Sequence, residues 1–326
     1  MMDLRQDIYY QKDYVALYLK EGDSIFEFEY TEGDKTFYQL TIKRPIRQVG
    51  EVLLDEIYYD LETAYGYGGY LCNTDDMVFI EKAWTAYQNK CKEENIIAEF
   101  VRYHPFNESH FILKNQFSFY TKDRNVVLMD LSLSDEERWE GYASRTRGKL
   151  RKCDRELKIR KSEDIGAFMK LYNETMDKNN AQSFFYFDKD FYNKVLKIKE
   201  IELYNIYYEE TILSSSFYIF SRDFVHYFLS GNNYNVQKNH NANYFIFEKI
   251  ASIAKERGIK YFNLGGGRSG DPEDSLFKYK SLFSDYNRPF FLSGAIYNKE
   301  KYDELNQLWQ TQNPEHEVKF FLKYRI

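Results

Sequence analysis

Three consecutive glycines at residues 265–267, followed by Arg268, form the first stretch whose residue types could hold a ligand. They follow "IKYFNL", an apolar run that predicts a strand. Glycine tolerates positive φ and lets a ligand approach the backbone, and open sheets bind ligands beyond the carboxyl ends of their strands. Arg268 could hold a phosphate or carboxylate through two hydrogen bonds. We expect Gly265, Gly266 and Arg268 to border a ligand site; the alternative is a flexible surface loop.

A basic segment runs from Arg145 to Lys161, with nine Lys or Arg against two Asp or Glu in a chain of net charge −6. Such local asymmetry indicates an anion site. The phosphates of a nucleotide-sugar diphosphate, of a lipid diphosphate or of a tRNA end would all fit. We expect Arg145, Arg147 and Arg151 to contact this ligand. A solvated helix face explains the charge run equally well.

His104 lies in "RYHPF", directly after a predicted strand, and is one of five histidines. An imidazole there could act as a general base near neutral pH. The competing interpretation is a turn-capping role for a histidine that precedes proline. The sequence has no Ser/His/Asp order, HExxH motif or Walker loop, which argues against a hydrolase or an NTPase.

Composition limits the remaining possibilities. With 326 residues, 43 % of them hydrophobic and 19 % aromatic, the chain can bury a core in one large domain or in two. The negative net charge argues against DNA binding. No apolar run is long enough to span a membrane, and the first residues lack a signal peptide. Three cysteines without metal-ligand spacing predict free thiols, no metal site and a cytoplasmic location.

The two halves of the chain show the same order of elements. The first half predicts a hairpin at 24–46, a strand at 49–59, a glycine loop, a helix from Met77 capped by Asp75 or Asp76, and a strand at 95–103. The second half predicts a helix at 164–176, and strands at 201–208, 212–220 and 224–231. A polar loop, a helix that ends at Gly258 and a strand at 259–264 follow. The sequence therefore predicts two copies of one α/β unit, in domains 1–145 and 146–326.

This order resembles the GNAT acyltransferase fold, and the chain as a whole resembles the Fem-like group of tandem GNAT proteins. The resemblance rests on these segments: "YGYGGYLCN", "EFVRYHPF", "RTRGKLRK", "HYFLSGNN", "ANYFIFEKIASIAKERGIKYFNLGGG" and "SLFKYKSLFS". The group contains aminoacyl-tRNA-dependent peptidyltransferases that build peptidoglycan bridges, and acyltransferases linked to surface polysaccharides. The resemblance implies an α/β (α+β) fold with two tandem GNAT-like domains, each a mixed, mostly antiparallel sheet flanked by helices.

The resemblance also implies roles for particular residues. In "SLFKYKSLFS", Tyr279 and Lys280 match an aromatic-lysine pair in which the lysine polarises the reacting carbonyl or leaving phosphate. Gly68 and Gly69 match a glycine loop that lines the substrate groove.

In GNAT enzymes a Gln/Arg-x-x-Gly-x-Gly/Ala loop binds the pyrophosphate of coenzyme A at a helix N-terminus. Gln237, Asn239 and Ala242 lie in the matching loop, where His240 replaces the central glycine. That replacement puts coenzyme A binding in doubt, because a side chain can block close backbone approach.

The function that follows from the resemblance is transfer of an acyl or aminoacyl group to an amine of a cell-envelope or polysaccharide precursor. No cofactor is expected to be bound permanently, and acyl-CoA or aminoacyl-tRNA would serve as co-substrate. The acceptor would be a phosphorylated small molecule or lipid-linked precursor, which is compatible with peripheral membrane contact. The alternative is a catalytically inactive GNAT pair that binds a phosphorylated sugar or a protein.

Overall fold

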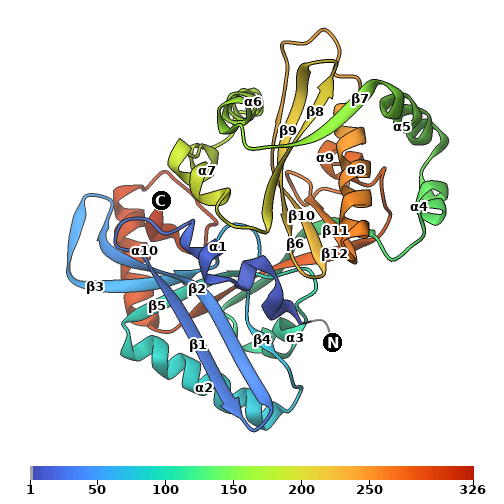
Figure 1. Ribbon diagram of the computed structural model, residues 1–326. Helices are drawn as coiled ribbons and strands as arrows, with labels where there is room; N and C mark the ends of the chain where they lie inside the picture. The colour runs from blue at the N-terminus through green and yellow to red at the C-terminus, as the bar shows by residue number, and fades with distance from the viewer. Residues whose placement is uncertain (1–2) are drawn as a thin grey trace. The chain divides into compact units, whose positions relative to one another are not determined.

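A long hairpin begins the sheet of the first structural unit. Its strands β1 (Ser24–Glu32) and β2 (Lys35–Val49) meet at Gly33, whose φ of +62° suits a tight turn. Next to β2 come β3 (Val52–Glu62), β5 (Ile96–Arg102) and β12 (Asn287–Ile296), and the short β4 (Leu71–Cys72) also pairs with β2. Only β3 and β5 run parallel in this set. The structure is a computed structural model that describes residues 3–326 (Figure 1).

Two helices cover the faces of this first sheet. Helix α2 (Met77–Glu93) begins at Asp76, whose carboxylate accepts hydrogen bonds from the amides of Val78 and Phe79. Neighbouring residues of β5 point to opposite faces: Ile96 packs with the α2 cluster, and Ile97 packs with the cluster around α10 (Lys299–Gln312). The apolar run of β5 is thus explained by burial on both faces.

The sheet of the second unit contains the meander predicted from the sequence. Its strands lie in the order β6 (Phe119–Asp130), β11 (Tyr261–Gly266), β10 (Phe224–Asn232), β9 (Thr211–Phe220), β8 (Ile201–Tyr208) and β7 (Leu157–Ser162). Only β10 and β11 run parallel, as the connecting helix between them requires.

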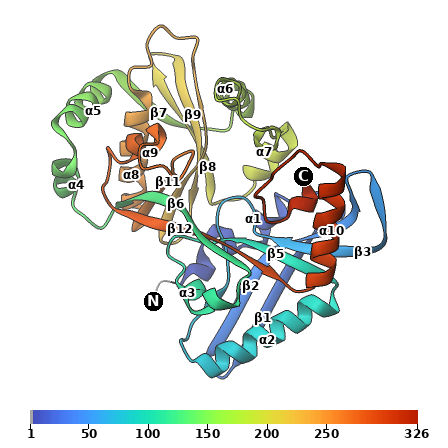
Figure 2. The ribbon, with the colours of Figure 1, turned by 180° about the vertical axis from the view of Figure 1, so that it is seen from behind.

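Helices α6 (Ile165–Lys178) and α7 (Lys189–Val195) lie on one side of this sheet (Figures 1 and 2). The other side carries α5 (Ser144–Glu156), α8 (Ala242–Glu256) and α9 (Ser275–Lys280), while α4 (Asp135–Gly141) precedes α5. Phe168 of α6 packs edge-on against Phe217 of β9, and Phe247 of α8 packs against Phe262 of β11. The sheet therefore has an apolar core on both faces.

The ends of the chain depart from the predicted division at residues 145 and 146. The C-terminal segment belongs to the first unit, and a short N-terminal segment belongs to the second. The first unit comprises the residues up to Arg5, Tyr9–Asp123 and Pro289–Ile326, and the second comprises Gln6–Ile8 and Arg124–Arg288. Residue 145 falls inside α5 of the second unit. The difference arises because β12 pairs with β5 of the first unit, and β6 pairs with β11 of the second.

The predicted fold class is confirmed, because the strands of each unit are mixed and mostly antiparallel and are flanked by helices. The predicted hairpins, the meander and the helices α2, α6 and α8 are present close to their expected bounds. The segment around Lys278 and Lys280 forms the short helix α9. None of the helices in residues 3–326 is long and apolar enough to cross a membrane.

Candidate active site

Lys280 is a buried lysine at the end of α9 in the second unit. The helix begins at Asp274, whose Oδ1 accepts hydrogen bonds from the amides of Leu276 and Phe277 at 2.9 and 3.0 Å. Lys280 closes the same short helix, and only 5 % of it is exposed. Its Nζ donates to the carbonyl oxygen of Gly266, at the end of β11, at 2.7 Å. The structure thus brings together the lysine and the glycine run that the sequence marked separately.

Burial lowers the pKa of Lys280 to about 7, with the nearby Asp274 raising it and Arg124 lowering it. Within residues 3–326, the Gly266 carbonyl is the one hydrogen-bond acceptor of the ammonium group, which also lies 5.6 Å from the centre of the Tyr227 ring. An ammonium has three donors. Two of them are therefore available to a ligand oxygen, and the group gains or loses its proton near neutral pH.

The glycines allow the turn to pack closely around this ammonium. Gly265 has φ +75°, and a Cβ there would lie 3.3 Å from Nζ of Lys280. A Cβ on Gly266 would lie 2.9 Å from the carbonyl oxygen of Asn125, and one on Gly267 would lie 2.5 Å from Oδ1 of Asp274. Gly266 and Gly267 thus allow close packing of the turn. Gly265 keeps a side chain away from the lysine.

Tyr279 contributes a buried hydroxyl group to the same region. Its ring lies edge-on to Tyr244 at 5.2 Å and to Phe283 at 5.8 Å. The hydroxyl oxygen is buried and has no hydrogen-bond partner among the described residues, and burial raises the pKa of Tyr279 well above its ordinary value. Buried polar atoms are rarely left unpaired without a reason. The Tyr279 hydroxyl can therefore accept or donate one bond to a bound ligand.

The polar loop before α8 has the backbone conformation that a glycine would adopt. His240 and Asn241 have φ values of +53° and +59°, in the left-handed region. Asn239 supports the first turn, because its Oδ1 accepts a hydrogen bond from the amide of Ala242 at 3.1 Å. Gln237 is exposed. The loop therefore has a left-handed backbone at the position where histidine replaces glycine.

The side chain of His240 contacts two neighbouring residues of the second unit. Its Nδ1 lies 3.0 Å from Oε2 of Glu156, and its ring stacks on Tyr208 with centroids 4.0 Å apart. The left-handed backbone is thus held by a hydrogen bond and a stacking contact. His240 is therefore the one side chain of this loop on which the predicted steric hindrance to coenzyme A binding rests.

The basic segment folds as α5 and β7, and its arginines differ in their surroundings. Arg147 donates to the carbonyl oxygens of Glu140 and Tyr142 at 3.1 and 2.5 Å, so it stabilises the end of α4. Arg145 and Arg151 are exposed, and the Arg151 guanidinium lies 5.5 Å from the Trp139 ring. Arg145 and Arg151 keep their charges available to an anion, whereas Arg147 has a structural role.

Lys149 and Tyr244, which the sequence analysis did not single out, connect α5 to Tyr279. Nζ of Lys149 lies 2.8 Å from the hydroxyl of Tyr244 and 4.0 Å from the centre of that ring. Tyr244 in turn packs against Tyr279. The position of Lys149 within the basic segment was a usable signal. Nothing in the sequence distinguishes Tyr244 from the other 30 tyrosines.

Arg268 is exposed and held to its own unit. Its Nη2 donates to Oδ1 of Asn179 at 2.7 Å, and its backbone amide donates to Oδ2 of Asp274 at 3.1 Å. The glycine turn is therefore ordered around Asp274. The bond to Asn179 leaves four of the five guanidinium donors of Arg268 to serve a ligand.

His104, Gly68 and Gly69 lie in the first unit and are buried. Nδ1 of His104 accepts a hydrogen bond from the amide of Phe106 at 3.2 Å, as the turn-capping interpretation requires. Gly69 has φ +93°, and a Cβ there would lie 2.4 Å from Cδ1 of Tyr103. The surroundings of the two glycines explain their presence by close packing. Their expected contact with a substrate stays a prediction.

Comparison with known proteins agrees with this architecture. Residues 142–281 match the family model of the acetyltransferase (GNAT) domain, a range that contains α5, the loop before α8, the glycine turn and Lys280. No curated protein sequence matches the chain. This part of the second unit is therefore similar to a GNAT acetyltransferase domain.

Solved structures extend the likeness to nearly the whole chain. The fold is similar to that of FemX, with a TM-score of 0.70 at 13 % identity over 93 % of this chain and 94 % of that one. The C-terminal domain of a putative lysylphosphatidylglycerol synthetase from Agrobacterium fabrum matches with a TM-score of 0.53 at 13 % identity, covering 85 % of each chain. L-PGS from Bacillus licheniformis matches with a TM-score of 0.50 at 13 % identity over 83 % and 84 % of the chains. The predicted Fem-like fold is therefore confirmed.

Proposed function

We propose that the chain transfers an acyl or aminoacyl group to an amine of a cell-envelope or polysaccharide precursor. The observation that carries this proposal is Lys280, a buried amine with spare donors next to the glycine turn at the end of β11. A preorganised cation in a water-poor site stabilises developing negative charge far better than one in solution.

The proposed reaction is a direct acyl transfer. The neutral acceptor amine attacks the carbonyl carbon of the donor, and a C–N bond forms while the carbonyl oxygen becomes an oxyanion next to the Lys280 ammonium. Collapse of this intermediate breaks the bond to the leaving oxygen or sulfur. The proton lost by the amine goes to that leaving group. The chain supplies positioning and charge stabilisation, with no covalent enzyme intermediate.

Two donors are proposed, and the structure gives each a specific support. The left-handed backbone at His240 and Asn241 favours acyl-CoA, because positive φ is the conformation that glycine readily adopts in the matching phosphate-binding loop before α8. The likeness to FemX and to a putative lysylphosphatidylglycerol synthetase favours aminoacyl-tRNA. We propose a phosphorylated acceptor, either small or lipid-linked, contacting the exposed Arg145 and Arg151.

The test is a transfer assay with the purified full chain. Acetyl-CoA and a mixture of labelled aminoacyl-tRNAs serve as donors, with amino-sugar nucleotides and amine-bearing peptidoglycan or lipid precursors as acceptors. Lys280→Met is the control for each productive pair. Transfer that depends on Lys280 supports the proposal. Binding of a phosphorylated sugar without transfer from either donor supports an inactive binding module and overturns it.

A further inference from the structure

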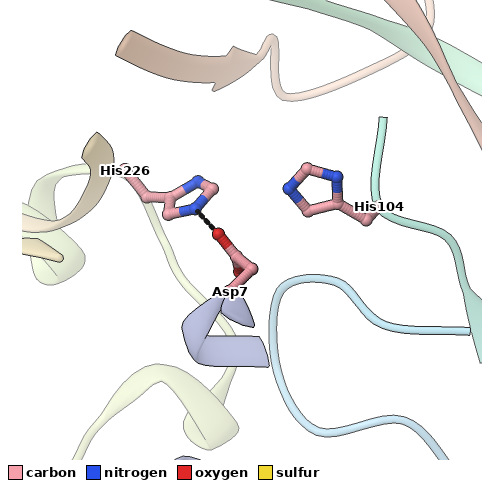
Figure 3. A group of neighbouring side chains, drawn as sticks. All are labelled: Asp7, His104 and His226. Atoms are coloured by element: carbon pink, nitrogen blue, oxygen red, sulfur yellow. Dashed lines mark hydrogen bonds and ion pairs between the residues drawn. The ribbon is translucent and has the colours of Figure 1, made fainter. Parts of the chain in front are cut away.

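A series of hydrogen-bonded, buried polar side chains ends at the backbone of the glycine turn. Asp7, His226 and Asn263 are 3 %, 1 % and 3 % exposed, and all three belong to the second unit. Nε2 of His226 lies 2.9 Å from Oδ2 of Asp7. Figure 3 marks this contact with a dashed line. Nδ1 of the same ring lies 3.3 Å from Nδ2 of Asn263. The catalytic proposal uses none of these groups.

The hydrogen bonds fix the direction of each donor in this chain. Oδ1 of Asn263 accepts from the amide of Gly265 at 2.9 Å, so its Nδ2 must face His226 and donate. The Nδ1 of His226 is then the acceptor, and its Nε2 carries the hydrogen that is donated to Asp7. With Nδ1 occupied by the Asn263 amide, His226 orients its neighbours and is not arranged as a base.

Asn263 acts at an irregular point of β11. It pairs directly with His226 across the parallel strands β10 and β11. On the other side of β11 the register shifts between Asn263 and Gly265, which marks a β-bulge, and Gly265 has φ +75°. Bulges re-aim backbone groups next to functional sites. The side-chain bond from Asn263 to the Gly265 amide spans this bulge and holds it.

The next carbonyl beyond the bulge is the one that Lys280 uses. Gly266 presents its oxygen to Nζ at 2.7 Å. The orientation of that oxygen depends on the Gly265 torsion angles, which Asn263 restrains. Three buried polar groups cost desolvation energy that an apolar cluster would avoid. Their connection to a functional lysine gives them a role beyond packing.

We propose that Asp7, His226 and Asn263 are positioning residues that hold the Gly265–Gly266 turn, and through it the ammonium group of Lys280, in place for acyl transfer. The role in acyl transfer rests on the proposed function, whereas the hydrogen bonds that hold the turn do not depend on it. The charged and titratable groups around Lys280 are Asp274 at the start of α9, Arg124 on β6 and the Tyr227 ring on β10. None of the three is altered by the substitutions below.

The experiment is an NMR titration of the full chain labelled with [13C]lysine. The Lys280 signal is assigned by its loss in Lys280→Met. Asn263→Ala is compared with the matched control Asn205→Ala, which removes a buried asparagine of β8 that is bonded to Ser215 and not to the turn. Relaxation of the turn admits water, so Asn263→Ala should raise the Lys280 midpoint by about one pH unit or more. His226→Gln should shift it in the same direction by less.

Asn205→Ala should lower the melting temperature without moving the Lys280 midpoint. If Asn263→Ala does not fold, Asn263→Ser is used, because its hydroxyl can still accept from the Gly265 amide. In that background His226→Gln should cause no further shift. An unchanged Lys280 midpoint in Asn263→Ala and His226→Gln overturns the proposal, as does an equal shift in Asn205→Ala. The titration needs no substrate, so its result is independent of whether acyl transfer is found.

Discussion

The Nζ of Lys280 is hydrogen-bonded to the backbone carbonyl of Gly266 at 2.7 Å and not to a carboxylate. The nearest influential carboxylate, that of Asp274, accepts hydrogen bonds from the amides of Leu276 and Phe277 at the start of α9. A neutral carbonyl anchors the amine without neutralising its charge. The positive charge is therefore left for a ligand, which is the arrangement that stabilisation of an oxyanion requires.

Removing this amine should abolish turnover. Lys280→Met keeps the length and apolar stem of the side chain but removes the donor, and loss of one oxyanion donor costs about 10²–10³ in kcat. Steady-state kinetics with the productive donor and acceptor measure this. Lys278→Met, two residues earlier at an exposed position, is the matched control and should retain activity. Near-wild-type kcat in a folded Lys280→Met variant would exclude the assignment.

The same substitution should stabilise the fold at pH 7. A buried amine replaced by an apolar side chain of similar volume is often neutral or stabilising by about 1–4 kcal/mol. In the unfolded chain the lysine keeps its ordinary pKa of 10.5, whereas the folded value is about 7. Between these values only the unfolded state binds the proton, so wild-type stability rises with pH and the gap to Lys280→Met narrows. Urea melts at pH 6.5 and 9.5 test this, and a constant gap would contradict it.

The pH dependence of the reaction distinguishes two roles of Lys280. The ammonium form exists below its pKa of about 7. If that form stabilises the oxyanion, kcat/KM should fall as pH rises through about 7. The assay uses hydroxylamine as acceptor, because an amine that is already neutral adds no rising limb of its own. A kcat/KM that instead rises through pH 7 would assign Lys280 as a proton acceptor in its neutral form.

The arginines of α5 should separate into binding and structural groups. Arg145→Gln with Arg151→Gln should weaken binding of a phosphorylated acceptor by about 2–4 kcal/mol and flatten its salt dependence, because both side chains are exposed. Arg147→Gln should instead lower the melting temperature, since it loses two bonds to backbone carbonyls. Calorimetry and thermal melts measure the two effects. Lys197→Gln, also exposed in the second unit, controls for net charge. Unchanged affinity in the double variant would place the acceptor elsewhere.

Coenzyme A should bind weakly to the wild-type chain and more tightly to His240→Gly. Glycine adopts the observed φ of +53° without strain and leaves the backbone amides before α8 open. Calorimetry with acetyl-CoA is the measurement. Lys197→Gln, at an exposed position outside this loop, provides a control that keeps His240. A low-micromolar dissociation constant for the wild type, about −8 kcal/mol, would show that the loop accepts coenzyme A despite His240.

The sequence by itself determined the local elements and the family of folds. Period-two runs gave the meander β8–β10, and apolar spacing gave α2, α6 and α8, because each needs only neighbouring residues to show which face is buried. The glycine run, the loop before α8 and the aromatic-lysine pair were visible for the same reason. These segments supported a resemblance to tandem GNAT proteins, and the fold predicted from that resemblance agrees with the comparisons.

Tertiary structure alone decided which of these residues meet. The contact of Lys280 with Gly266, the pairing of Arg147 with backbone carbonyls and the chain from Asp7 through His226 to Asn263 join residues up to 219 positions apart. The assignment of β12 to the first unit likewise follows from pairing with a distant strand, β5. Burial and pKa depend on such distant neighbours. A single sequence shows the side chain of Lys280, but only packing removes water from around it and lowers its pKa.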